Sequence, residues 1–170
     1  MKKNQLTTTR STALTLGKTK SLMSITKKLL EGKSKELTTH EDITIIGNLM
    51  WGKDTQEWMS WDEAMEYAKK LRLGGYDDWR LPTREELREV VTLCGGVAMN
   101  DDEDDLDGTK NIANEAYQAN YQEKGFIPDG YWSSTTTADR SDSAWIVNFE
   151  YCIGTNDYID SATYHVRCVR

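Results

Sequence analysis

The fold is decided by residues 74–87, which read GGYDDWRLPTREEL. The two glycines end one amphipathic stretch, and the proline stands just outside the start of another. Thr83 and Glu86 have the spacing of a capping box, in which the two side chains accept backbone N–H groups of the first helical turn. The segment therefore predicts a short connection between two helices.

The same pattern occurs once more on the N-terminal side of this connection. Ser60 and Glu63 form a second capping-box pattern ahead of residues 61–71, where apolar residues recur at helical spacing. Within the connection, Arg80 is placed to stack on the indole of Trp79 and to donate hydrogen bonds to loop carbonyls. We expect two amphipathic helices joined by residues 75–82.

Strand patterns lie on both sides of the helical pair. Residues 43–46 are a β-branched run, and residues 145–149 alternate so that Trp145 and two further apolar residues face a core. Residues 165–169 predict a final strand, and a weak helical pattern covers 112–121. Two helices followed by late strands predict an α+β fold.

Charge divides the chain into two parts. The 170 residues carry a net charge of -7, but residues 1–40 carry +7 and the remainder -14. We expect a basic helical N-terminal extension over residues 1–42, with its helix at 18–30, and one domain over 43–170. The extension could dock on its own domain, on further copies or a carrier protein, or on a polyanion. Because it lacks aromatic residues that stack on bases, we favour assembly over nucleic acid.

The first residues lack the uninterrupted apolar run of a signal peptide, and no stretch approaches the roughly 20 apolar residues of a membrane span. We therefore expect synthesis in the cytoplasm and no membrane partner. The final location, cytoplasm or phage particle, stays open.

No pattern of a reaction centre or of a metal or cofactor site is visible. His40 and His165 belong to no nucleophile motif, and a phosphate-binding loop and paired-cysteine zinc motifs are absent. We expect His165 at the surface and the three cysteines as buried or incidental thiols, with a Cys94–Cys168 disulfide only in an oxidising compartment. Residues 100–108 form an acidic loop without the ligand pattern of an EF-hand, and looser cation binding there stays open. The sequence predicts a protein that is not an enzyme.

An ordered series of motifs also resembles a known family, the C-terminal domain of the Legionella collagen-like adhesin. The resemblance runs from about residue 43 to residue 170. It implies a C-type-lectin-like fold, with two helices packed on small twisted antiparallel sheets and a ligand face near the C-terminus. The motifs that carry it are Asn48-Leu49-Met50-Trp51, Trp61-Asp62-Glu63-Ala64, Gly74-Gly75-Tyr76, Asp78-Trp79-Arg80-Leu81-Pro82-Thr83, Glu86-Leu87, Tyr131-Trp132-Ser133-Ser134, Ala144-Trp145, Val147, Phe149 and Val166-Arg167-Cys168-Val169-Arg170.

The chain is also similar to the variable proteins of diversity-generating retroelements, in which adenines of a C-terminal coding segment are randomised. Substituting adenines in an AAC codon never produces Lys, Glu, Gln, Met or Trp. Forty of residues 1–134 are of these types, so about nine are expected among the 31 residues of 135–165, yet only Trp145 and Glu150 occur. Avoidance of Lys, Glu and Met by strands and loops is the competing explanation.

Between the apolar positions of this variable region lie tyrosines and short polar residues, the mixture that antibody loops use. We expect them to bind a protein or glycan ligand without a metal. The alternatives are an adhesin of the same fold without diversification and, less favoured, an oxidase like the formylglycine-generating enzyme. The predicted ligand-binding residues are Asp139, Arg140, Ser141, Asp142, Ser143, Tyr151, Thr155, Asn156, Asp157, Tyr158, Asp160 and Ser161.

Overall fold

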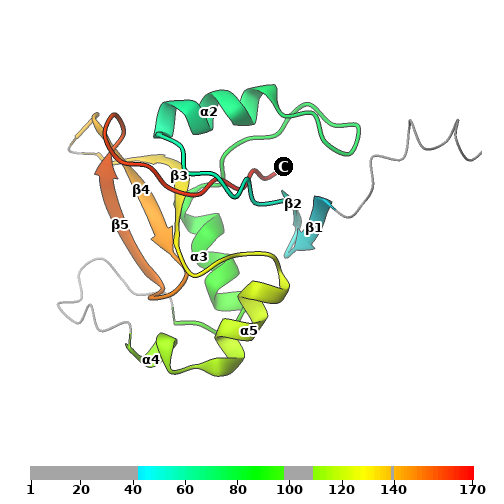
Figure 1. Cartoon of the computed structure of the whole chain (residues 1–170), viewed down its shortest axis with the longest axis vertical. Coiled ribbons are helices and arrows are strands. Elements are labelled where there is room, and N and C mark those ends of the chain that lie inside the picture. The colour runs from blue at the N-terminus through cyan, green and yellow to red at the C-terminus, as the bar shows by residue number, and fades with distance from the viewer. Residues whose placement is uncertain (1–41, 98–108, 139) are drawn as a thin grey trace, which may run out of the picture. The chain divides into compact units, whose positions relative to one another are not determined.

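The structure, a computed structural model, describes residues 42–97, 109–138 and 140–170, all within one compact unit that spans residues 39–170 (Figure 1). The predicted basic extension and the acidic loop lie outside the described residues, except for Asp42. The described part is an α+β fold with small antiparallel sheets. Its elements are β1 (Ile43–Ile46), β2 (Leu49–Gly52), α2 (Trp61–Lys70), α3 (Arg84–Leu93), α4 (Thr109–Ile112), α5 (Glu115–Glu123), β3 (Gly130–Thr136), β4 (Ser143–Asn148) and β5 (Ile153–Tyr158).

The two predicted helices are confirmed, and both begin at a complete capping box. Ser60 caps α2 and Thr83 caps α3, each with its glutamate bonded back to the cap. The side chain of Arg80 donates to Glu86 at 2.7 and 2.6 Å and to the Leu81 carbonyl at 3.2 Å. This ion pair, in place of the expected stacking on an indole, fastens the connection to the first turn of α3.

The strands differ from the prediction at three places. The first predicted strand is β1, and residues 49–52, for which no strand was predicted, form β2, which pairs with it. Residues 153–158, for which the sequence predicted no strand, form β5, the third strand of the sheet β3-β4-β5. Residues 165–169 are extended but form only isolated bridges. Val169 is opposed to Trp51 of β2 and exchanges two backbone hydrogen bonds with Arg80 of the α2–α3 connection.

The predicted helix at 112–121 is broken into α4 and α5. Asn114 interrupts it, because its side chain accepts the backbone N–H of Tyr117 and so caps α5. The restart directs Tyr117 and Tyr121 into the core, where both are fully buried.

The core consists of two clusters, which receive alternate residues of β3 and β4. Tyr131 and Val147 join the aromatic cluster against α3, whereas Trp132 and Ile146 join the cluster against α2. Both faces of β4 are thus covered. The alternating pattern of residues 145–149 predicted only one buried face, with Trp145 in it, but Ile146 is buried and Trp145 lies partly exposed. A central strand with a helix against each face buries both of its sides.

Candidate functional site

The hairpin of β4 and β5 carries most of the predicted ligand-binding residues. Opposed residues of an antiparallel pair place their side chains on the same face. Asn156 is opposed to Trp145 and Tyr158 to Ser143, on the face that turns toward α3. Thr155 and Asp157 lie on the other face, opposed to Ile146 and Ala144. The predicted run 155–158 is therefore divided between two faces.

One end of this hairpin brings six of the predicted residues together. The loop before β4 and the turn after β5 are joined by a hydrogen bond from the Ile159 N–H to the Asp142 carbonyl, at 3.0 Å. The Arg140 guanidinium reaches Asn156 Oδ1 at 3.4 Å, and Tyr158 is 47% exposed. The exposed residues of this end, here called the distal patch, are Arg140, Ser141, Asp142, Tyr158, Asp160 and Ser161.

Tyr151 lies at the opposite end, in the turn between β4 and β5. Its N–H donates to the Asn148 side chain at 3.1 Å, and its carbonyl accepts from Asn111 at 3.4 Å. Strands of six residues separate it from Tyr158 by roughly 17 Å. Tyr151 is 40% exposed but lies outside the group of residues gathered at the other end.

Two predicted site residues have structural roles, and one lies outside the described residues. Ser143 is only 1% exposed, so the expectation that it contacts a ligand was wrong: the start of β4 is covered on both faces. Asp157 accepts a hydrogen bond from the Tyr164 hydroxyl at 2.8 Å, and burial raises the pKa of that phenol to about 12. Asp139 belongs to the residues that the structure does not describe.

Trp145 is a surface residue that the sequence prediction assigned to the core. The guanidinium of Arg84 lies 3.7 Å from the centre of its ring. The same guanidinium lies beside Gly154, where an added Cβ would stand 3.4 Å from Arg84 Nε. The indole therefore lies between the Arg84 side chain and the neighbouring Asn156, on the face that also carries Tyr158.

A buried polar cluster lies away from the hairpin. His165, expected at the surface, is 5% exposed, with Nδ1 3.4 Å from Asp54 and Nε2 3.6 Å from Asp129. The Tyr131 hydroxyl donates to the other Asp54 oxygen, and the indole of Trp58 meets the imidazole edge-on. These contacts join the segment before α2, the start of β3 and the C-terminal segment. The cluster is a structural tie between three segments.

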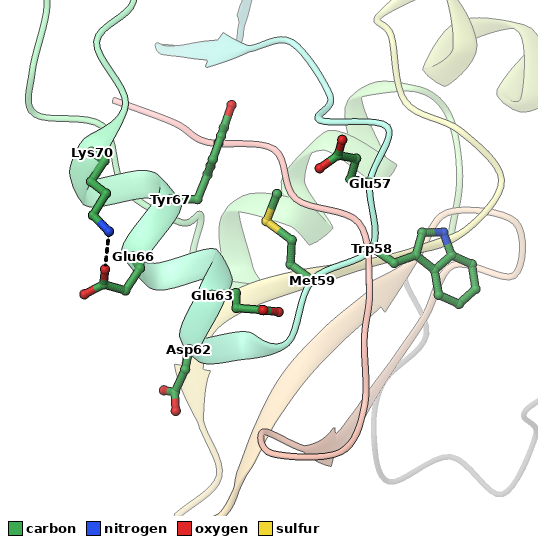
Figure 2. A pocket seen from close by; sticks show the side chains of 8 residues that line it. All are labelled: Glu57, Trp58, Met59, Asp62, Glu63, Glu66, Tyr67 and Lys70. Carbon is green, nitrogen blue, oxygen red and sulfur yellow. Dashed lines mark hydrogen bonds and ion pairs between the residues drawn. The ribbon is translucent and has the colours of Figure 1, made fainter.

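A shallow concavity of about 580 Å³ lies beside α2, and none of its lining residues falls within the variable region. Figure 2 shows carboxylates along the helix, with Lys70 bonded to Glu66, and Trp58 on the segment opposite. The Glu63 side chain belongs to the capping box. Among the described residues, no group of three or more His, Cys, Asp or Glu side chains could hold a metal ion.

A comparison with protein families finds that a model described as the Lcl C-terminal domain matches residues 45–170. The chain belongs to the Lcl C-terminal domain family. Membership confirms the resemblance at the level of the family and suggests an adhesin-like, non-enzymatic role. A search of curated proteins finds no match. In the described part of this Lcl C-terminal domain protein, no helix has the length and apolarity that crossing a bilayer requires.

The three thiols of the Lcl C-terminal domain are free and buried. Cys94 and Cys152 lie in the cluster against α3, and Cys168 lies in the cluster against α2, so the Cys94–Cys168 disulfide is not formed. Burial raises the pKa of Cys152 to about 11 and that of Cys168 to about 12. Thiols held in the protonated form are poor nucleophiles and poor metal ligands.

These pKa values predict a loss of stability at high pH. An unfolded thiol titrates near pH 8.5, so above that pH the unfolded state releases protons that the native state keeps. The stabilisation that the two thiols give the folded state is complete below about pH 8.5 and is lost as the pH rises toward their native-state pKa values. At pH 10.5 the loss is about 2 kcal/mol for each thiol. Urea unfolding at pH 8 and 10.5 measures it. Cys168→Ala should show a shallower decrease, and an unchanged decrease would contradict the assignment.

Proposed function

We propose that this chain is a non-enzymatic, adhesin-like ligand-binding protein whose contact surface is the distal patch together with Trp145 and Asn156. The observation that carries the proposal is that the hairpin combines exposed and buried residues. Every residue of the patch is exposed, whereas the neighbouring Ala144, Ile146 and Val147 are buried in the two clusters. Side chains at the patch can therefore change while the core that supports them stays the same.

The chemistry of this surface suits recognition of another macromolecule. Tyr158 and Trp145 offer rigid aromatic area, and Arg140, Ser141 and Asp160 offer charge and adaptable hydrogen bonds. The ligand is accordingly proposed to be a protein or a glycan, bound without a metal. The basic segment before residue 41 is proposed to serve assembly or attachment to a carrier, on its charge alone.

We further infer a C-type-lectin-like fold and diversification of residues 135–165 by a retroelement. The order of motifs and the two helices packed on small sheets support the fold. Diversification is supported by the scarcity of Lys, Glu, Gln, Met and Trp, which adenine substitution in an AAC codon never produces. The one Trp in this region, Trp145, lies in the middle of β4. Its codon, TGG, contains no adenine, so adenine substitution leaves this residue unchanged.

Two experiments test these proposals. Arrays of proteins and glycans probed with the intact protein should give saturable binding to one class of ligand, and binding should disappear when Arg140 and Tyr158 are both replaced by alanine. Binding that survives this replacement would place the contact elsewhere. For diversification, the DNA beside the gene should hold a reverse transcriptase and a near-copy of the last hundred or so bases that differs at adenines; a locus without them favours an adhesin that is not diversified.

A further inference from the structure

Among the residues that the structure describes, no strand pairs with the outer edge of β5. The Thr137 N–H donates to the Ser143 carbonyl, and the Phe149 N–H donates to the Asp129 carbonyl, so the odd-numbered residues of β4 bond toward β3. The even-numbered residues of β4 therefore bond toward β5, as the bond from Ile159 to Asp142 shows. Given the register, the backbone groups of 154, 156 and 158 point away from the sheet.

Two of these three residues have no backbone partner. The N–H of Tyr158 donates to Asp157 Oδ1 at 2.8 Å, and its carbonyl accepts from Ala162 at 3.1 Å. For Gly154 and Asn156, the structure shows no hydrogen bond to N–H or C=O within the described ranges. Two donors and two acceptors thus lie along one edge, at the spacing of a β-ladder.

Three features that commonly block strand pairing are absent from β5 itself. β5 contains neither proline nor lysine, and its register with β4 is unbroken over six pairs, so it has no bulge. The opposite edge of the same sheet is closed. There the Trp132 N–H donates to the His165 carbonyl at 3.1 Å, and the Ser134 N–H donates to the Pro82 carbonyl at 2.7 Å. In Figure 1, β5 lies on the outer side of the sheet, next to β4.

We propose that β5 accepts an extended segment of a partner polypeptide as a fourth strand of this sheet. Gly154 and Asn156 supply four backbone hydrogen bonds, and the exposed Tyr158 and Thr155, on opposite faces, contact alternate side chains of the partner. This inference rests on the proposed ligand-binding function and narrows its ligand to an uncharged or basic polypeptide. Residues 41–170 carry a net charge of -14, which disfavours a second copy of the domain as the added strand.

The test uses the full chain and a phage-displayed library of random dodecapeptides as the probe. A recovered peptide is synthesised, and its affinity is measured by calorimetry for the native chain, Asn156→Pro and Asn156→Ala. Proline removes an N–H that has no internal partner, and an edge position tolerates it, whereas alanine removes only the side chain. We expect Asn156→Pro to weaken binding about tenfold or more and Asn156→Ala about threefold or less.

Amide hydrogen exchange of the unmodified chain gives a second measurement that does not depend on the folding of a variant. The amides of 154 and 156 should exchange rapidly in the free protein and slowly with the peptide bound, while those of 155 and 157 are protected in both states. Failure to recover any peptide, or binding that leaves 154 and 156 unprotected, overturns strand addition. If Tyr158→Ala weakens peptide binding and Asn156→Pro does not, strand addition is overturned and the proposed function stands. If neither variant weakens peptide binding, strand addition and the proposed function are both overturned.

Discussion

Replacing Phe149 with alanine is expected to lower the free energy of unfolding by about 3–5 kcal/mol. Phe149 is fully buried, and its ring stacks on that of Phe126 with 4.2 Å between the ring centres. Tyr121 and Tyr131 meet it edge-on, at 5.8 and 5.3 Å. Truncation would leave a cavity between three aromatic rings that cannot close without moving α5 or β3. Urea unfolding, followed by the fluorescence of the buried tryptophans, measures the change.

Phe149→Leu is the matched control for this replacement. Leucine fills most of the same volume, so we expect about 1–1.5 kcal/mol of destabilisation, with the difference between the two variants reporting the cavity. A loss below about 1 kcal/mol for the alanine variant would mean that the aromatic cluster does not hold the hairpin in place.

Tyr158→Ala is expected to weaken binding of the array-identified ligand by about 30-fold or more while the melting temperature changes by about 2 °C or less. The ring is 47% exposed on the distal patch, and aromatic anchors of this kind contribute about 2 kcal/mol or more to protein interfaces. The backbone contacts of Tyr158 with Asp157 and Ala162 do not involve its ring and remain in the variant. Surface plasmon resonance and differential scanning calorimetry measure the two quantities.

Tyr151→Ala is the matched control at the other end of the hairpin. Tyr151 is exposed to a similar degree, 40%, but its distance from the patch predicts no more than about a threefold change in affinity. Equal losses in the two variants would contradict a contact confined to the distal patch. A fall in melting temperature of Tyr158→Ala by ten degrees or so would contradict the separation of binding from stability.

The sequence predicted the helices well because their signals are local. A capping box needs four residues, and Ser60 and Thr83 begin α2 and α3 where that pattern placed them. The signals for β5 were not local. Its residues are mostly polar and none of them is buried, so their composition resembles that of a loop. Only pairing with β4 makes them a strand.

The arrangement of the predicted site residues in space could not be read from the sequence. Alternation along β5 separates Thr155 and Asp157 from Asn156 and Tyr158, and the length of the strands separates Tyr151 from the patch. Both effects depend on register, which a single sequence does not specify. Burial of His165 was missed for a related reason: its partners Asp54 and Asp129 lie far from it along the chain.

The most direct test of the account compares two libraries of the full chain. One randomises the exposed positions Arg140, Ser141, Asp142, Tyr158, Asp160 and Ser161, and the other randomises the buried positions Ser143, Ala144, Ile146 and Val147. Protease resistance of displayed variants measures the folded fraction. We expect most members of the first library to stay folded and most members of the second to unfold. Equal losses in both libraries would show that the exposed side chains also hold the domain together, which contradicts the account.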